Sequence, residues 1–295
     1  MGSLILQAPP AIQVACFAIP HAQAVSGTVQ SVCRVEGPPE CLAVMIELLR
    51  PFYLVHPGPH RAEVQCKLMR LESFYAFEAG GVCHFGSCLE VTRFCEWWMV
   101  ACSLSRRLDL CQIHGAAVAD ERGAILMPGR SGCGKTTLTL GLYNFKTSSG
   151  RLLPLCDDVI LLERTGRLVR PFKRCFHIDR ATLEIIERLG LGDLLTLDPL
   201  PEGFCRPEVW SDPRIPRLLI FPEYCPGAAL HLERLRPARA WMMLVNHLIA
   251  SPDLGGTTPH FETLSALINS VEIYRMVHSD LAVTAAALDK LLSTG

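Results

Sequence analysis

The chain has 295 residues, a formal net charge of -1 and a hydrophobic share of 49%. Its length suits two domains, and its balanced charge excludes the basic footprint of a nucleic-acid-binding protein. No apolar run approaches the roughly 18 to 20 residues that a membrane-spanning helix needs. We therefore expect an α/β protein whose partners are neither nucleic acid nor membrane.

Residues 1–105 are typical of a smaller, β-rich N-terminal domain that ends in a linking helix. Short apolar or alternating runs stand between clusters of Pro, Gly and His, as they do between short strands. The helical period extends over 90–108, and no catalytic cluster occurs in this domain. The expected strands are 12–19, 52–55, 63–68 and 74–78, the last followed by the turn 80–81 of a hairpin.

Residues 106–295 are typical of a second, α/β domain. A strand over 110–119 turns at 120–123 into a short buried strand, 124–127. Farther along, the pattern predicts a hairpin that makes the sheet mixed, a helix over 179–189 that Gly190 ends, and a long loop over 198–216. The hairpin strands are 159–163 and 167–170, later strands are 218–221 and 229–232, and later helices are 237–250, 261–269 and 279–292.

A glycine-rich stretch after the strand 124–127 fits the phosphate-binding pattern G-x-x-x-x-G-K-[ST] at every fixed position. Glycines let backbone N–H groups approach anionic oxygens, and the helix that follows aims its positive end at them. Lys135 adds a positive charge for the β- and γ-phosphates, and the Thr136 hydroxyl suits Mg²⁺. We therefore expect ATP and Mg²⁺ as cofactors. The expected nucleotide-binding residues are Gly129, Arg130, Ser131, Gly132, Cys133, Gly134, Lys135, Thr136 and Thr137.

Two adjacent carboxylates, Asp157 and Asp158, end the apolar run 152–156, at a distance from the loop that is usual for such sites. Phosphoryl transfer needs a carboxylate near Mg²⁺ and a base or orienting group for the acceptor hydroxyl. Adjacent acids can divide these two roles. The alternative is that Asp158 only caps a turn.

Three of these segments together resemble the kinase domain of the HPr kinase/phosphorylase family. They are 114–115, 129–136 and 156–162. The resemblance is closer to the HPr-kinase-like proteins found beside peptide-modifying enzymes, such as the lasso-peptide kinases, and it covers roughly 108–290. It implies a P-loop kinase domain of HPr-kinase type with a mixed sheet.

The resemblance also implies roles for single residues. His114 matches the active-site histidine of the family and Lys135 its phosphate-binding lysine. Asp157 and Asp158 match the acidic pair, one acting as general base on the acceptor hydroxyl, without showing which. Thr136 and Asp158 are the expected metal ligands. The chain departs from the family over 170–179, where the glycine-rich signature with its Mg²⁺-binding glutamate is missing.

The function that we expect is a cytoplasmic, ATP-dependent kinase that phosphorylates a Ser or Thr hydroxyl of a peptide or small protein. Its expected partners are that substrate and other peptide-modifying enzymes, and a homo-oligomer stays open. Residues 1–100 either recognise part of the substrate or serve only stability or assembly. Three alternatives remain at this point. They are a kinase of small molecules such as free amino acids, an enzyme like phosphoenolpyruvate carboxykinase, and a non-catalytic nucleotide-binding scaffold in a peptide-modifying complex.

Overall fold

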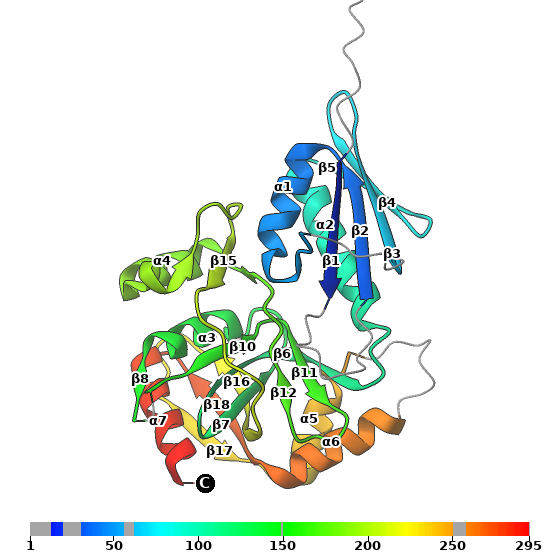
Figure 1. Ribbon diagram of the computed structural model, residues 1–295. Helices are drawn as coiled ribbons and strands as arrows, with labels where there is room; N and C mark the ends of the chain where they lie inside the picture. Colours follow the sequence, from blue (N-terminus) through cyan, green and yellow to red (C-terminus); the bar gives the residue numbers. More distant parts are fainter. Residues whose placement is uncertain (1–12, 20–30, 56–61, 149, 250–257, 295) are drawn as a thin grey trace, which may run out of the picture. The chain divides into compact units, whose positions relative to one another are not determined.

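The computed structural model describes residues 13–19, 31–55, 62–148, 150–249 and 258–294. The chain divides into two compact units, Met1–Arg106 (unit 1) and Arg107–Gly295 (unit 2). Each unit has its own sheets and its own packed helices (Figure 1).

In the described part of unit 1, five strands form one sheet in the order β1-β2-β3-β4-β5. β2 and β3 run parallel, and the other neighbours are antiparallel. The helices α1 and α2 contact each other and the sheet. The elements are β1 (Gln13–Ile19), β2 (Ser31–Gly37), α1 (Pro39–Leu48), a 3-10 turn (Arg50–Phe52), β3 (Val64–Arg70), β4 (Tyr75–Ala79), β5 (Val82–Gly86) and α2 (Cys88–Leu104).

Unit 1 differs from the expectation at several places, among them the strand β2, which was not predicted. Residues 39–48 form the helix α1, which the sequence analysis missed; Cys41 and Met45 are buried one helical turn apart on it. The prediction of a strand over 52–55 is wrong. A 3-10 turn over Arg50–Phe52 reaches into this range, and Tyr53 forms an isolated bridge to Phe17. The expected residue 12 lies outside the described residues.

The long helix α2 starts two residues before the expected position. Ser87 and Glu90 form a capping box: the Glu90 N–H donates to Ser87 Oγ at 3.3 Å, and the Ser87 N–H donates to Glu90 Oε2 at 2.8 Å. This pair satisfies two N–H groups that the first helical turn leaves without partners. The helix ends at Leu104, not at residue 108.

In the described part of unit 2, the main sheet has the order β12-β11-β6-β7-β16-β18-β17, and β10 also pairs with β6. β7, β16 and β18 are parallel neighbours, and the other pairs are antiparallel, so the sheet is mixed as expected. The elements through β15 are β6 (Leu110–Asp120), β7 (Gly123–Pro128), α3 (Lys135–Asn144), β8 (Lys146–Thr147), β9 (Gly150–Arg151), β10 (Leu153–Cys156), β11 (Val159–Glu163), β12 (Val169–Arg170), β13 (Phe176–His177), α4 (Arg180–Leu189), a 3-10 turn (Leu191–Leu194), β14 (Leu195–Thr196) and β15 (Phe204–Pro207). The remaining elements are β16 (Pro216–Tyr224), β17 (His231–Arg234), α5 (Pro237–Val245), α6 (Thr258–Ser270), β18 (Glu272–His278) and α7 (Leu281–Thr294).

In unit 2, two elements predicted from local sequence signals are present in the structure. The hairpin β11–β12 is confirmed. The helix α4 is confirmed as well: Asp179 accepts the Thr182 N–H at 2.8 Å, and Gly190 ends the helix in the left-handed region at φ 64°. The expected loop over 198–216 contains β15, which pairs with β13 and β14. The helix expected over 237–250 is shorter than predicted: α5 ends at Val245, and residue 250 lies outside the described residues.

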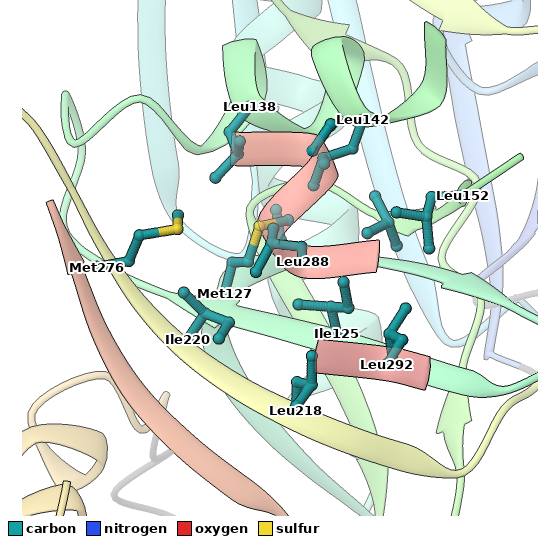
Figure 2. Packing of buried hydrophobic residues seen from close by; sticks show 13 residues of the cluster. Ile125, Met127, Leu138, Leu142, Leu152, Leu218, Ile220, Met276, Leu288 and Leu292 are labelled. Carbon is teal, nitrogen blue, oxygen red and sulfur yellow. The ribbon is translucent and has the colours of Figure 1, made fainter. Parts of the chain in front are cut away.

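The core of unit 2 lies between the sheet and two helices. Apolar residues of β7, β16 and β18 pack against α3 and α7 (Figure 2). Their burial holds α3 at a fixed place over the sheet. The residues labelled in Figure 2 are Ile125, Met127, Leu138, Leu142, Leu152, Leu218, Ile220, Met276, Leu288 and Leu292. No helix in the described residues is both long and apolar enough to cross a membrane.

Candidate active site

The glycine-rich loop connects β7 to α3, as expected. Gly132 and Gly134 have φ angles of 80° and 85°, a backbone region that other residues rarely adopt. Gly134 is the residue directly before the first turn of α3, so the free N–H groups of that turn open beside the loop. This arrangement favours an anionic ligand.

Lys135 is held inside the loop. Lys135 is only 5% exposed. Its Nζ donates to the carbonyl oxygens of Gly129 at 3.0 Å and of Arg130 at 2.8 Å. These two carbonyl oxygens partly compensate the ammonium charge. Phosphate oxygens are stronger hydrogen-bond partners for the ammonium group than carbonyl oxygens are. The lysine can therefore exchange its bonds to the loop carbonyls for bonds to a phosphate.

Asp157 joins the loop to the end of β10. The Thr136 hydroxyl donates to Asp157 Oδ2 at 2.9 Å. Asp157 is 3% exposed, and its Oδ1 has no hydrogen-bond partner in the described part of the chain. Burial, together with the neighbouring Asp158 charge, raises the pKa of Asp157 to about 7; the bond from Thr136 and the Lys135 charge act in the opposite direction.

Asp158 is more exposed than Asp157 and lines the cavity at the first turn of α3. Its φ of 67° is unusual for a residue with a side chain, and its carbonyl accepts the Gly115 N–H at 3.1 Å. Its carboxylate is half-exposed and lies 3.8 Å from Arg174 Nη1. The turn therefore buries one carboxylate against Thr136 and leaves the next one open to a ligand.

His114 lies on β6 opposite Val159, next to the acidic pair. Burial lowers the pKa of His114; the Lys135 charge adds to this, and the Asp158 charge opposes it. The adjacent Gly115 has no room for a side chain, because a Cβ there would lie 2.8 Å from Met127 O. The small residue thus lets β6 pass close to the start of the loop.

His247 is a neighbour of His114 that the sequence analysis missed. The backbone N–H of His114 donates to the backbone carbonyl oxygen of His247 at 2.7 Å. The centroids of the two imidazole rings are 6.5 Å apart. Burial lowers the pKa of His247, as do His114, Lys135 and Arg130. No sequence signal points to this pair, because the contact arises from a bridge between Ile113 and Leu248.

A cavity of about 1040 Å³ opens at the first turn of α3. One wall comes from α4 and the segment before it, and another from the ends of β16 and β18. Of the expected site residues, all of them described, Gly129, Arg130, Cys133, His114 and Asp157 do not line it. Those that do line it are Ser131, Gly132, Gly134, Lys135, Thr136, Thr137 and Asp158.

The donors near the loop fit a magnesium ion. The described residues contain no group of three or more His, Cys, Asp or Glu side chains that could hold a metal. Mg²⁺ is usually held by one or two carboxylates and by substrate phosphates, and it prefers oxygen ligands. The unpartnered, buried Asp157 Oδ1 and the Thr136 hydroxyl are such oxygens.

The geometry is thus a glycine-rich loop with a lysine, a threonine and an aspartate on a mixed α/β fold. No protein-family model and no curated protein matches the chain. Among solved structures, it is similar to the Hpr(Ser) kinase/phosphatase from Coxiella burnetii, at 10% identity and a TM-score of 0.26, over 62% of this chain and 93% of that chain. A TM-score of 0.26 is too low to support a conclusion about fold or activity.

Proposed function

We propose that this protein is an ATP-dependent phosphotransferase that phosphorylates a hydroxyl group. The observation that supports this most is the hydrogen bond between Thr136 and Asp157, beside a second, open carboxylate. A loop that only turned the chain would have no need to bury a carboxylate with one oxygen left without a partner, since such burial is costly. Phosphoryl transfer uses this combination of groups.

In the proposed site, the loop N–H groups and the first turn of α3 bind the β- and γ-phosphates. Lys135 moves its hydrogen bonds from the loop carbonyls to phosphate oxygens. Thr136 and Asp157 would hold Mg²⁺, in place of the pair Thr136 and Asp158 expected from the sequence. The ion, when bound, neutralises charge on the β- and γ-phosphate oxygens.

Asp158 is the proposed general base. Its carboxylate takes the proton of the acceptor hydroxyl while the acceptor oxygen bonds to the γ-phosphorus and the bond to the ADP oxygen breaks. Lys135 and Arg130 place positive charges beside His247, and Lys135 also acts on His114, at this end of the loop. Such charges stabilise the negative charge of the transferring group.

The finer proposal is that the acceptor is a Ser or Thr side chain of a peptide. In unit 1, β5 pairs with β4 on one side and is an edge of the described sheet. Phe85 on this strand is 59% exposed and contacts Phe74. An exposed edge can bind an extended peptide through backbone hydrogen bonds, with apolar side chains adding specificity. Other peptide-modifying enzymes are the proposed further partners.

The proposed setting is the cytoplasm. All fourteen cysteines are among the described residues and are free thiols. Free thiols persist in reducing compartments such as the cytosol.

The test compares the wild type with Asp158→Asn and with Asp212→Asn, a matched change of an exposed carboxylate outside the cavity. Binding of Mg²⁺-ATP is measured by calorimetry, and transfer by mass spectrometry of Ser- and Thr-containing peptides and of free serine. We expect Asp158→Asn to bind ATP within about threefold of the wild type and to lose transfer by at least about 100-fold. Binding without ADP formation in the wild type would show a scaffold. Faster phosphorylation of free serine than of any peptide would show a small-molecule kinase.

A further inference from the structure

His278, the last residue of β18, is a buried imidazole without a hydrogen bond. It is 2% exposed, and neither Nδ1 nor Nε2 has a partner in the described part of the chain. A buried polar side chain loses its hydrogen bonds to water, and native proteins nearly always replace them. The imidazole therefore lacks a partner that a ligand could supply.

The ring lies at the first turn of α3 and lines the cavity there. Its Nε2 is 3.9 Å from the position that a Cβ on Gly134 would occupy. Because Gly134 has no side chain, nothing from this residue separates the ring from the free N–H groups of α3. The same place is where the phosphates of the proposed nucleotide bind.

The protein fixes the ring in this position. Tyr224, opposite His278 in the parallel pair of β16 and β18, has its ring 5.8 Å away at 62°. The Cys225 N–H donates to His278 O at 3.0 Å, and Ser279 Oγ donates to Ala228 O at 2.8 Å. Both ends of the short segment around His278 are thus tied to neighbouring chain, so the ring can contribute a hydrogen bond at little conformational cost.

The chemistry selects an anionic partner. Burial lowers the pKa of His278, so the imidazole is neutral at physiological pH and keeps one N–H donor. A donor beside the positive end of a helix suits the oxygens of phosphate groups.

We propose that His278 is a nucleotide-binding residue that donates its Nε2–H to a phosphate oxygen of the bound nucleotide at the first turn of α3. This inference rests on the proposed function, because it needs a nucleotide in the loop. It adds a donor from the end of a neighbouring strand, outside the glycine-rich motif.

The test measures binding of ADP and of pyrophosphate by calorimetry. His278→Phe keeps a ring of similar size without the donor, and we expect it to bind both ligands about tenfold more weakly, as the loss of one hydrogen bond to a charged group implies. His278→Gln places an amide N–H near the same point and should stay within about threefold. His231→Phe, at an exposed position of β17 and outside the cavity, is the matched control and should bind as the wild type does.

The outcomes separate the two proposals. A wild type that binds neither ligand contradicts the proposed function as well as this inference. A wild type that binds both, with His278→Phe unchanged, shows that His278 is only a core residue. A loss for ADP with pyrophosphate unaffected places the contact at the nucleoside and overturns the phosphate assignment.

A measurement on the wild-type protein tests the same contact without relying on the folding of a variant. In wild type labelled with ¹⁵N-histidine, ADP should shift the His278 Nε2 resonance and slow the exchange of its proton with solvent. The resonance is assigned by its absence in His278→Gln. An unmoved resonance under saturating ADP refutes the proposal.

Discussion

Replacing Asp157 by Asn should stabilise the ligand-free protein while destroying its proposed site. The wild-type carboxyl is buried, and its pKa is raised from 3.8 to about 7. A raised carboxyl pKa means that folding favours the protonated form, so the free energy of unfolding falls as the pH rises from about 4 to about 7. At about pH 8, the ionised Asp157 therefore destabilises the folded state fully.

The size of the effect follows from that difference in pKa. At 1.36 kcal/mol per pKa unit, it corresponds to about 4 kcal/mol, which is an upper bound for the gain on removing the charge. Asn keeps an acceptor for the Thr136 hydroxyl, but it places an N–H₂ group where the second oxygen has no partner, at a cost of about 1–3 kcal/mol. The expected net gain is about 2 kcal/mol, or a Tm increase of about 4–8 °C for a unit of this size.

The assay is thermal unfolding followed by circular dichroism, in EDTA and without nucleotide, at about pH 8 and at about pH 5. Asp212→Asn, a change of an exposed carboxyl, is the control and should leave Tm unchanged at both values. The gain for Asp157→Asn should be present at the higher pH and vanish at the lower one, where the wild-type carboxyl is protonated. A gain that does not depend on pH, or a variant less stable than the wild type at about pH 8, would refute the reasoning.

Three further predictions concern other parts of the proposed function. Lys135→Ala should lower phosphoryl transfer by several powers of ten and weaken ATP binding, because it removes the charge that reaches the phosphates; unchanged turnover in a kinetic assay would contradict the site. Mg²⁺-ATP should protect the loop residue Cys133 from iodoacetamide, read by mass spectrometry, while the exposed Cys83 of unit 1 labels equally with and without nucleotide; equal labelling of Cys133 would count against nucleotide in the loop. Phe85→Asp on the edge strand β5 should reduce peptide phosphorylation at least fivefold, with ATP binding and phosphorylation of free serine unchanged; full activity on peptides would remove unit 1 from substrate recognition.

The sequence by itself determined the elements whose signals are local. The glycines of 129–134, a buried strand before them and a helix after them predict the order β7, loop, α3, and the structure has that order. Asp179 and Gly190 likewise mark the ends of α4 through hydrogen bonds and a left-handed residue within one turn. The helix α1 was missed because its short apolar pattern is equally compatible with a buried strand.

The division of labour between the two aspartates required the tertiary structure. Adjacent residues give no sequence signal for which one is buried. In the fold, β10 and β11 both pair with β6, and the turn between them takes Asp158 to a positive φ. That turn directs Asp157 toward Thr136 and leaves the Asp158 carboxylate half-exposed.

The wall of the cavity that the ends of β16 and β18 form also came only from the fold. His278 lies far from the glycine-rich loop in sequence, in a strand whose neighbours are set by a crossover, and no local pattern encodes such a pairing. Because β7, β16 and β18 are parallel, their carboxyl ends meet at one edge of the sheet, where ligands bind in folds of this kind. The sequence thus defined the loop, whereas the order of the strands decided which distant side chains surround it.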